Sequence, residues 1–465
     1  MNFYLRNKLI ITDYTKEMLD FCNQHLSFDN PDYIKKEAMG KWTGNTPRKM
    51  VLFEQRPDTL ILPFGVAMQV YKTFKDKISF IKPIFATIRE REYKSSIKTY
   101  EYQERGIQAI LRHKNGILVA PCGSGKTQMG LEAIARIGGK ALWITHTKDL
   151  LNQSLERARG LFDIRPTEFG TITDGKINIG NTITFSTVQT LANIDIKEKE
   201  LIDEWDVIVV DECHKAVGSP TQMMMFYKVL SQLSARFKIG LTATPYRADG
   251  LQKCMFAILG DIVYEIPKSA VKDTTCKVKV EFVDTEFSPD IDVITAGDGT
   301  LVYASLVDSI IKDQKRNQKI IDRVKGIDGA TMLLSDRIEH LNLLYNALPD
   351  ADKAKCVVIS GQGQTKKAKD ERKKALKMLD KGEIKYIFAT YKLAKEGLDV
   401  PNLRYVVFAT PQKDKTTVIQ SAGRVGRKAE GKEFGIVIDF CDNFGMLRGY
   451  ERKRKGYYKA LGYDF

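Results

Sequence analysis

No stretch of this 465-residue sequence approaches the roughly 20 consecutive apolar residues that cross a bilayer. The first residues, MNFYLRNKLIITDY, lack the apolar segment and the small-residue cleavage site of a secretory signal. These two absences argue against both a membrane protein and a secreted one. We therefore expect a cytoplasmic protein without a membrane partner.

Paired cysteines and clustered histidines are also missing. The seven cysteines are scattered without a C-x-x-C pair, and the five histidines are equally dispersed. This pattern predicts neither a disulfide framework nor a zinc site. Acidic residues are too few to balance the basic ones, which leaves a net charge of +15. Such an excess favours a polyanionic partner without identifying it.

The chain is too long for a single hydrophobic core, and its first 94 residues differ in pattern from the remainder. A strand-like segment, Phe3–Thr12, precedes an amphipathic helical pattern at Lys16–Leu26, and a second helical pattern covers Val66–Phe74. Between them, Arg48–Glu54 and Thr59–Leu62 are β-prone and flank a hairpin-type turn. Residues 1–94 are therefore predicted to form a small α+β module.

From about Lys98 onward, short apolar runs alternate with amphipathic helical patterns, which is typical of a parallel sheet covered by helices. The first set of predicted strands is Ile117–Ala120, Ala141–Thr145, Ile183–Ser186, Val207–Val210 and Lys238–Leu241. After the alternating strand Lys277–Phe282, the second set is Ala330–Leu334, Cys356–Ile359, Tyr386–Ala389, Tyr405–Ala409 and Phe434–Asp439. The predicted fold is α/β, with two parallel-sheet lobes in tandem after the α+β module, at residues 1–94, 95–272 and 273–465.

A glycine-rich turn, Ala120–Thr127, lies between the apolar run Gly116–Val119 and the helical pattern Gln128–Ile137. Backbone N–H groups of such a turn wrap phosphate oxygens, and the helix N-terminus adds positive potential. In this setting Lys126 is expected to reach the β- and γ-phosphates, and the Thr127 hydroxyl to hold Mg²⁺. The phosphate-wrapping positions of the turn are Gly123, Ser124 and Gly125.

Two later strands end in residues that suit the chemistry of a nucleotide. Val207–Val210 leads into Asp211 and Glu212. We expect Asp211 to hold the hydration shell of Mg²⁺ and Glu212 to act as the general base for an attacking water. Thr242 and Thr244 end another apolar strand, where their hydroxyls are expected to relay the state of the γ-phosphate to another surface.

Near the C-terminus, QSAGRVGR places Arg424 and Arg427 three residues apart, which predicts one shared helical face. Across a domain cleft, two such arginines would stabilise charge on a transferring phosphoryl group. The segment Arg448–Lys459 then carries six basic residues interleaved with tyrosines. This segment suits either a solvated helix face or a nucleic-acid contact, and the sequence leaves both open.

This ordered series resembles the superfamily 2 helicases of the DEAH/D-E-x-H branch over about residues 98–440. The similarities are Tyr102-Gln103 to the Q-type motif, APCGSGKT to motif I, Trp143–Leu150 to motif Ia, Ser186–Thr190 to motif Ic, DECH to motif II, TATP to motif III, Leu334–Asp336 to motif IV, Thr390 with Glu396–Pro401 to motif V, and QSAGRVGR to motif VI. The stretches Gly40–Gly44 and Leu60–Gly65, with the tail Arg452–Tyr463, are similar to UvsW-type phage recombination helicases.

The resemblance implies two RecA-like lobes that share one ATP and Mg²⁺. It implies that Gln103 reads adenine, and that the second lobe contributes Gly397, Asp399, Gln420, Arg424 and Arg427. Nucleic acid would lie across both lobes, held through its phosphates at Lys148, Thr187, Ser335, Ser360, Gly361 and Thr390.

In the N-terminal module, a hairpin carrying Arg48, Lys49 and Arg56 would sit on duplex at a fork, the alternative being a lid that only stabilises the first lobe. The implied activity is that of a monomeric ATP-dependent DNA helicase or translocase that unwinds or branch-migrates forked and branched DNA in replication, recombination or repair, in the host cytoplasm if a phage encodes it. A duplex translocase without strand separation and an RNA helicase remain alternatives. An inactive nucleotide-gated binder is disfavoured, because the expected catalytic residues are present.

Overall fold

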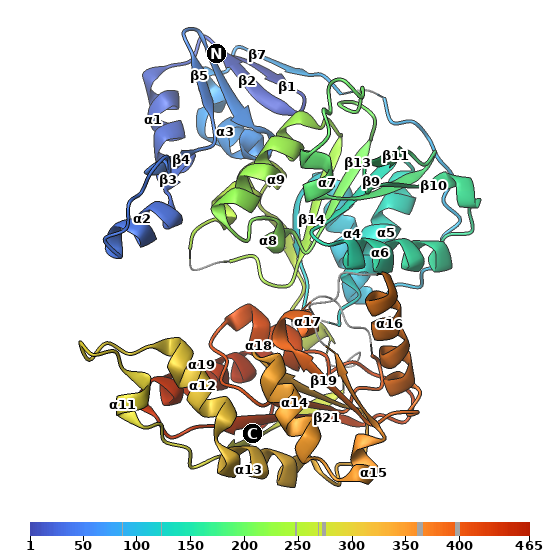
Figure 1. Cartoon of the computed structure of the whole chain (residues 1–465). Helices are drawn as coiled ribbons and strands as arrows, with labels where there is room; N and C mark the ends of the chain where they lie inside the picture. The colour runs from blue at the N-terminus through green and yellow to red at the C-terminus, as the bar shows by residue number, and fades with distance from the viewer. Residues whose placement is uncertain are drawn as a thin grey trace. The chain divides into compact units, whose positions relative to one another are not determined.

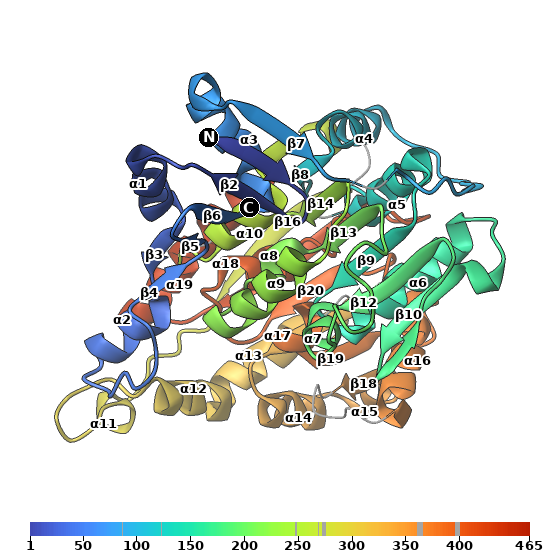
Figure 2. The same cartoon turned by 90° about the horizontal axis from the view of Figure 1, so that it is seen from above.

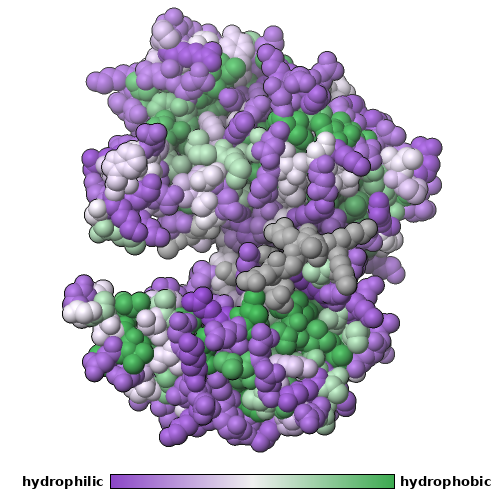
Figure 3. All heavy atoms as spheres, viewed as in Figure 1, coloured by the Kyte–Doolittle hydropathy of each residue, from purple (hydrophilic) through white to green (hydrophobic). Residues whose placement is uncertain are grey.

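The computed structural model describes residues 1–85, 87–121, 123–246, 249–267, 269–271, 276–359, 366–395 and 400–465. The chain divides into two compact units, Met1–Pro267 and Lys268–Phe465 (Figure 1). In the part of the chain that the structure describes, no helix is both long and apolar enough to cross a membrane. Hydrophilic residues predominate on the face seen in Figure 3, with hydrophobic residues in scattered patches.

The first unit begins with a five-stranded sheet in the order β5-β6-β2-β1-β7. Its strands are β1 (Asn2–Leu5), β2 (Lys8–Thr12), β5 (Glu54–Arg56), β6 (Thr59–Pro63) and β7 (Phe80–Pro83). The other elements of this module are α1 (Lys16–His25), β3 (Ser27–Asp29), α2 (Pro31–Ala38), β4 (Lys49–Val51), η1 (Phe64–Val66), α3 (Ala67–Phe74) and η2 (Lys75–Lys77). The α+β character predicted for this segment is confirmed.

Two details of the predicted module are wrong. Phe3–Thr12 is a hairpin of two antiparallel strands, because the chain turns at Arg6 and Asn7. Arg48 and Lys49 do not belong to the same hairpin as Arg56: β4 pairs with β3 in a separate ribbon, while β5 and β6 form the hairpin. The separation follows from burial, since Met50 and Leu52 enter the core of the module and hold that segment beside β3.

The module and the following parallel-sheet lobe share one hydrophobic core. Asn7 donates hydrogen bonds to the carbonyls of Ser231 and Gln232 at 2.8 and 3.1 Å. Gly65 approaches the backbone so closely that a Cβ there would lie 2.4 Å from the nitrogen of Gly260. This contact explains why glycine ends the run Leu60–Gly65, and it makes the module part of the first lobe's packing.

The lobe that follows has an eight-stranded sheet in the order β11-β10-β12-β9-β13-β14-β8-β15, whose central strands lie side by side in Figure 2. All pairs are parallel except that of β10 and β11. The strands are β8 (Asn115–Val119), β9 (Ala141–Thr145), β10 (Phe169–Thr173), β11 (Lys176–Asn178), β12 (Ile183–Thr187), β13 (Val207–Asp211), β14 (Phe237–Thr242) and β15 (Ile262–Glu265).

Helices cover both faces of this sheet, as expected for parallel strands (Figure 1). One face carries α4 (Glu101–His113), α5 (Lys126–Ile137) and α6 (Lys148–Leu161). The other carries α7 (Val188–Ala192), α8 (Cys213–Ala216), α9 (Pro220–Gln232) and α10 (Gln252–Leu259). The short helix η3 (Pro166–Glu168) precedes β10.

The second unit contains a six-stranded, fully parallel sheet in the order β16-β21-β20-β17-β19-β18. Its strands are β16 (Lys277–Asp284), β17 (Thr331–Ser335), β18 (Cys356–Ile359), β19 (Tyr386–Thr390), β20 (Tyr405–Phe408) and β21 (Phe434–Cys441). One face packs on α13 (Gln314–Val324) and α14 (Ile338–Ala347), and the other on α16 (Lys366–Asp380), α17 (Tyr391–Lys395), α18 (Lys415–Ala422) and α19 (Gly445–Leu461). The remaining helices are α11 (Ile291–Ile294), α12 (Tyr303–Lys312) and α15 (Asp350–Lys353). Two parallel-sheet lobes in tandem are thus confirmed.

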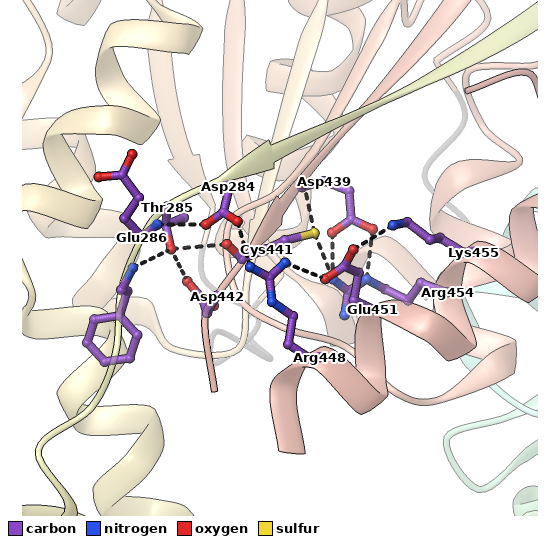
Figure 4. A network of polar contacts seen from close by, with 11 residues as sticks. Asp284, Thr285, Glu286, Asp439, Cys441, Asp442, Arg448, Glu451, Arg454 and Lys455 are labelled. Atoms are coloured by element: carbon purple, nitrogen blue, oxygen red, sulfur yellow. Dashed lines mark hydrogen bonds and ion pairs between the residues drawn. The ribbon is translucent and has the colours of Figure 1, made fainter. Parts of the chain in front are cut away.

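The basic C-terminal helix α19 is tied to its own sheet by ion pairs (Figure 4). The Arg454 guanidinium donates two hydrogen bonds to Asp439, at 2.7 and 2.8 Å, and both side chains are buried. Arg448 bridges Asp284 and Glu451 at 2.6 and 2.9 Å. Half of the six basic residues are thereby paired inside the unit (Arg448, Arg454 and Lys455), and the exposed ones are Arg452, Lys453 and Lys459.

Arg454→Met is expected to destabilise the second unit by about 3–5 kcal/mol, because it leaves the buried Asp439 carboxylate without its charge partner. Arg452→Met, on the exposed side of the same helix, is the matched control and should change stability by less than about 0.5 kcal/mol. Urea unfolding of the full chain measures both. Equal midpoints for the two variants would contradict a structural role for Arg454.

A second buried charge lies where the N-terminal module packs on the first lobe. Lys238 in β14 is fully buried, its Nζ donates to the Leu230 carbonyl at 3.2 Å, and it lies 4.7 Å above the centre of the Phe64 ring. Burial lowers the pKa of this ammonium from 10.5 to about 7. Between these two values the unfolded chain holds a proton that the folded chain has lost, so stability rises with pH across that range.

Lys238→Met is therefore expected to raise the melting temperature of the first unit below pH 7, where the buried charge is most costly. The advantage over wild type should shrink as the pH rises toward 10, by at most about 1.4 kcal/mol per pH unit. Thermal unfolding of both proteins at pH 6 and pH 9 measures this difference. An advantage of the same size at both pH values would show that the charge is not its cause.

Candidate functional site

The glycine-rich turn lies where the sequence predicted, between β8 and α5. Gly123 and Gly125 adopt positive φ angles of 84° and 81°, a region that favours glycine. The Lys126 ammonium lies within the turn and donates to the carbonyls of Ala120 and Pro121 at 3.3 and 3.5 Å. The turn therefore has the backbone shape of a phosphate cradle, and Cys122 lies outside the described residues.

Gln103 and Tyr102, at the start of α4, support this turn through hydrogen bonds to its backbone. The Gln103 amide donates to the Ser124 carbonyl at 2.8 Å and accepts from the Tyr100 backbone at 3.0 Å, while the Tyr102 hydroxyl reaches the same Ser124 carbonyl at 3.2 Å. A Cβ on Gly125 would lie 2.4 Å from the Gln103 amide nitrogen. Gln103 therefore positions the turn, a role the sequence did not predict, and its contact with adenine stays a prediction.

Asp211 ends β13 and Glu212 follows it, and β13 is separated from β8 only by β14. The Glu212 backbone has a left-handed conformation, with φ at 48°, and its N–H donates to the Asp211 carboxylate at 2.9 Å. Such a backbone is strained for a residue other than glycine, and strained positions are typical of functional sites. The conformation turns the chain sharply from β13 into α8.

The surroundings shift the pKa values of these two carboxylates in opposite directions. Burial and the neighbouring Glu212 raise the pKa of Asp211. Burial also acts to raise the pKa of Glu212, but the Lys126 ammonium, 3.8 Å away, together with His214, Lys215 and His146, outweighs it and holds the pKa of Glu212 below its usual value. Glu212 is thus the more readily ionised of the pair, and a cation beside Asp211 would lower the cost of ionising it.

The residues expected to bind a metal are oxygen donors. The Thr127 hydroxyl accepts from Arg157 of α6 at 3.4 Å, and Asp211 supplies the carboxylate. A hydroxyl and a single carboxylate fit Mg²⁺, which keeps several waters and takes substrate phosphates as further ligands. Among the residues that the structure describes, no cluster of three or more His, Cys, Asp or Glu forms a dedicated metal cage.

A buried chain of polar contacts leads away from Glu212. His214 lies 3.4 Å from the Glu212 carboxylate, and its Nδ1 shares a 2.8 Å hydrogen bond with the Thr242 hydroxyl. That hydroxyl also accepts from the Thr244 backbone at 3.1 Å. The two threonines therefore connect to the carboxylate site through His214, which sequence reasoning did not select although it is part of the DECH motif.

In the second unit, Gln420 lies in α18 and is nearly buried, and its side-chain oxygen has no hydrogen-bond partner among the described residues. Arg424 is buried and donates to the Ala394 carbonyl of α17. The prediction that Arg424 and Arg427 share a helical face is wrong. Helix α18 ends at Ala422, and the chain continues to Arg427 in turns closed by backbone hydrogen bonds three residues apart. Gly397 and Asp399 lie outside the described residues.

The hydroxyls predicted to bind nucleic acid lie at the carboxyl ends of parallel strands, the edge at which open α/β sheets bind ligands. Thr187 and Thr390 accept backbone N–H groups at the starts of α7 and α17. Ser335 is fully buried, and its hydroxyl contacts His340 at 3.0 Å, so this position does not favour the predicted contact.

The predicted basic contacts lie at the surface. Lys148, at the start of α6, forms an exposed ion pair with Asp174, and Arg48 and Lys49 are exposed. Ser360 and Gly361 lie outside the described residues.

Two protein families match this chain in the order of its lobes. Residues 96–247 match the family described as Type III restriction enzyme, res subunit, and residues 309–429 match the helicase conserved C-terminal domain. The chain is 24% identical to a putative ATP-dependent RNA helicase of Acanthamoeba polyphaga mimivirus, over 81% of this chain and 70% of that protein. It is 23% identical to the ATP-dependent DNA helicase uvsW of Enterobacteria phage T4, over 97% of this chain and 93% of that protein.

Among solved structures, S. cerevisiae Dbp5 bound to RNA and ADP BeF3 aligns with a TM-score of 0.53 and 18% identity, over 78% of this chain and 88% of that one. This likeness supports the tandem RecA-like fold. The two family matches lie in order on the two lobes of that fold. The chain resembles the UvsW type, and it belongs to the superfamily 2 helicases, enzymes that hydrolyse ATP as they act on nucleic acid.

Proposed function

We propose that this protein is an ATP-dependent DNA helicase or translocase that unwinds or branch-migrates forked and branched DNA. The observation that carries the proposal is the extent of the similarity to the T4 DNA helicase uvsW, which spans 97% of the chain and therefore includes the N-terminal module. The family matches begin only at residue 96. A substrate preference shared with that relative would thus come from a part of the chain outside the motor itself.

In the proposed ATP site, Lys126 binds the β- and γ-phosphates, and Thr127 and Asp211 hold Mg²⁺. The metal, when bound, would neutralise charge on the phosphates. Glu212 orients the attacking water and accepts its proton, a role supported by a pKa that Lys126 and the neighbouring basic side chains hold low enough to keep the carboxylate ionised. His214 keeps Glu212 connected to Thr242 and Thr244, which would report the state of the γ-phosphate to the surface.

The second unit is proposed to complete the site with Gln420, Arg424 and Arg427, together with Gly397 and Asp399. The unpartnered buried oxygen of Gln420 supports this role, because a buried polar atom without a partner is costly unless a ligand satisfies it. ATP would favour the conformation in which both units contact it, and hydrolysis would remove that preference. Alternation between the two conformations would move the enzyme along nucleic acid.

Nucleic acid is proposed to contact the carboxyl edges of both sheets near Lys148, Thr187 and Thr390, chiefly through phosphates. Such contacts carry little sequence information and are strongly salt-dependent. Arg48 and Lys49 would add contacts to duplex at a branch. The mimivirus relative, named as an RNA helicase, supports RNA as the second candidate substrate, and ATPase stimulation by matched DNA and RNA forks decides between them.

Glu212→Gln is expected to retain ATP binding while hydrolysis falls by about 10²–10⁴-fold, because the base is lost and the shape of the side chain is kept. Lys126→Ala should lower turnover by about 10²–10³-fold through loss of phosphate stabilisation. Glu156→Gln, an exposed carboxylate on α6, is the matched control. Nucleotide binding and steady-state ATPase assays measure these effects. If Glu212→Gln hydrolysed ATP at the wild-type rate, Glu212 would not be the base.

The double variant Arg48→Gln with Lys49→Gln is expected to weaken binding to forks and to flatten its salt dependence. Each lost contact with duplex phosphate should reduce the slope of log K against log salt by about 0.9. Lys72→Gln with Lys75→Gln makes the same charge change at exposed positions elsewhere in the module. Filter binding across a salt series measures the slopes. Identical slopes for both double variants would show that Arg48 and Lys49 do not contact phosphate.

A further inference from the structure

The loop between α2 and β4 carries one tryptophan, Trp42, whose side chain is almost fully exposed to solvent. The Trp42 side chain is 88% exposed, whereas the other two tryptophans of the chain, Trp143 and Trp205, are 0% and 2% exposed. A large aromatic ring held in water loses the free energy that burial would give it. Its position therefore suggests a surface that is covered when a ligand binds.

The loop that carries Trp42 is closed at both ends. Helix α2 ends at Ala38, Gly40 follows with a φ of 61°, and the Lys41 N–H donates to the carbonyl of Lys36 at 2.9 Å. On the other side, the Lys36 ammonium donates to the Thr46 hydroxyl at 2.7 Å. Trp42 thus lies between the two points at which the loop is tied to Lys36.

The ring itself rests on Gly44. A Cβ placed on Gly44 would lie only 3.2 Å from the Trp42 ring, and the φ of Gly44 is 54°. Glycine avoids both the strain of this backbone conformation and a tight contact with the ring. The indole is therefore held in place by the loop while most of its surface stays open, which lowers the entropy lost when a flat ligand stacks on it.

The charge around the loop is mainly positive. Residues 29–49 carry five lysines or arginines and three acidic side chains, and Lys41, Arg48 and Lys49 are exposed. A cationic surface that surrounds one exposed aromatic ring suits a ligand that combines phosphates with flat bases. Single-stranded nucleic acid binds in this way, because base stacking on an aromatic side chain and phosphate contacts act together.

We propose that Trp42 stacks on an unpaired base, or on the last base pair of a duplex, at the branch point of the DNA. Lys41, Arg48 and Lys49 would hold the flanking phosphates. This inference rests on the proposed function and names the residue through which the N-terminal module recognises the branch. The stack reads no sequence, since every base presents a flat face.

Tryptophan fluorescence tests the contact directly, without any ATPase step. Forked DNA added to the full chain is expected to quench the emission of exposed Trp42, and blunt duplex of the same length should quench it less. Trp42→Phe supplies the signal of the two buried tryptophans alone, and the difference between the proteins isolates Trp42. If a fork binds and the difference in emission between wild type and Trp42→Phe does not change, the proposal is overturned. The exposed ring would then be available to a protein partner.

Affinity supplies the second measurement. Trp42→Ala should weaken fork binding by about 5- to 100-fold, the range for loss of one base stack, and Trp42→Phe should retain part of the affinity. Tyr71→Ala, an exposed aromatic on α3 of the same module, is the matched control and should leave fork binding within about twofold of wild type. Unfolding midpoints equal to that of wild type exclude a folding defect.

The outcomes separate this inference from the function on which it rests. If wild type binds forks and linear duplex equally, the proposed branch specificity fails. If wild type prefers forks but Trp42→Ala binds them as well as wild type does, the specificity stands and the role of Trp42 is overturned.

Discussion

The parallel pairing of β8, β14 and β13 is the constraint on which the rest of the candidate site depends. Because the three strands run in one direction, their carboxyl ends meet at the same edge of the sheet. The phosphate turn follows the first, Thr242 ends the second and Asp211 ends the third. Their order brings together residues that lie far apart in the chain, and it leaves the threonine strand between the two nucleotide-binding strands.

That strand order allows polar side chains at the edge of the sheet to contact one another in series. The Lys126 ammonium favours the ionised form of the Glu212 carboxylate. The His214 imidazole contacts that carboxylate and also forms a hydrogen bond with the Thr242 hydroxyl. The left-handed backbone at Glu212 is the local strain that aims its side chain toward Lys126. Within the first unit, a change at the phosphate turn therefore acts on the strand end through a short path of direct contacts.

The sequence predicted those parts of the structure that depend on burial. Strands such as Ala141–Thr145 and Cys356–Ile359 match in full, because a strand covered on both faces is almost entirely apolar. The hairpin inside Phe3–Thr12 was missed, since no glycine or proline marks the turn at the polar residues Arg6 and Asn7. The helical face predicted for Arg424 and Arg427 was wrong because spacing alone does not show where the helix ends, and α18 ends at Ala422. The brace formed by Gln103 depends on a contact between α4 and a turn about 20 residues later, which no local pattern records.

The continuous core beneath the N-terminal module has a mechanical consequence. A module attached by a flexible linker would meet its ligand at an effective concentration set by the linker's length. Here the glycine contact at Gly65 and the hydrogen bonds of Asn7 fix the module to the first lobe, so it does not behave as a tethered domain. Any force exerted on the module passes directly into β14 and α10, and the surface of the module keeps a constant distance from the phosphate turn.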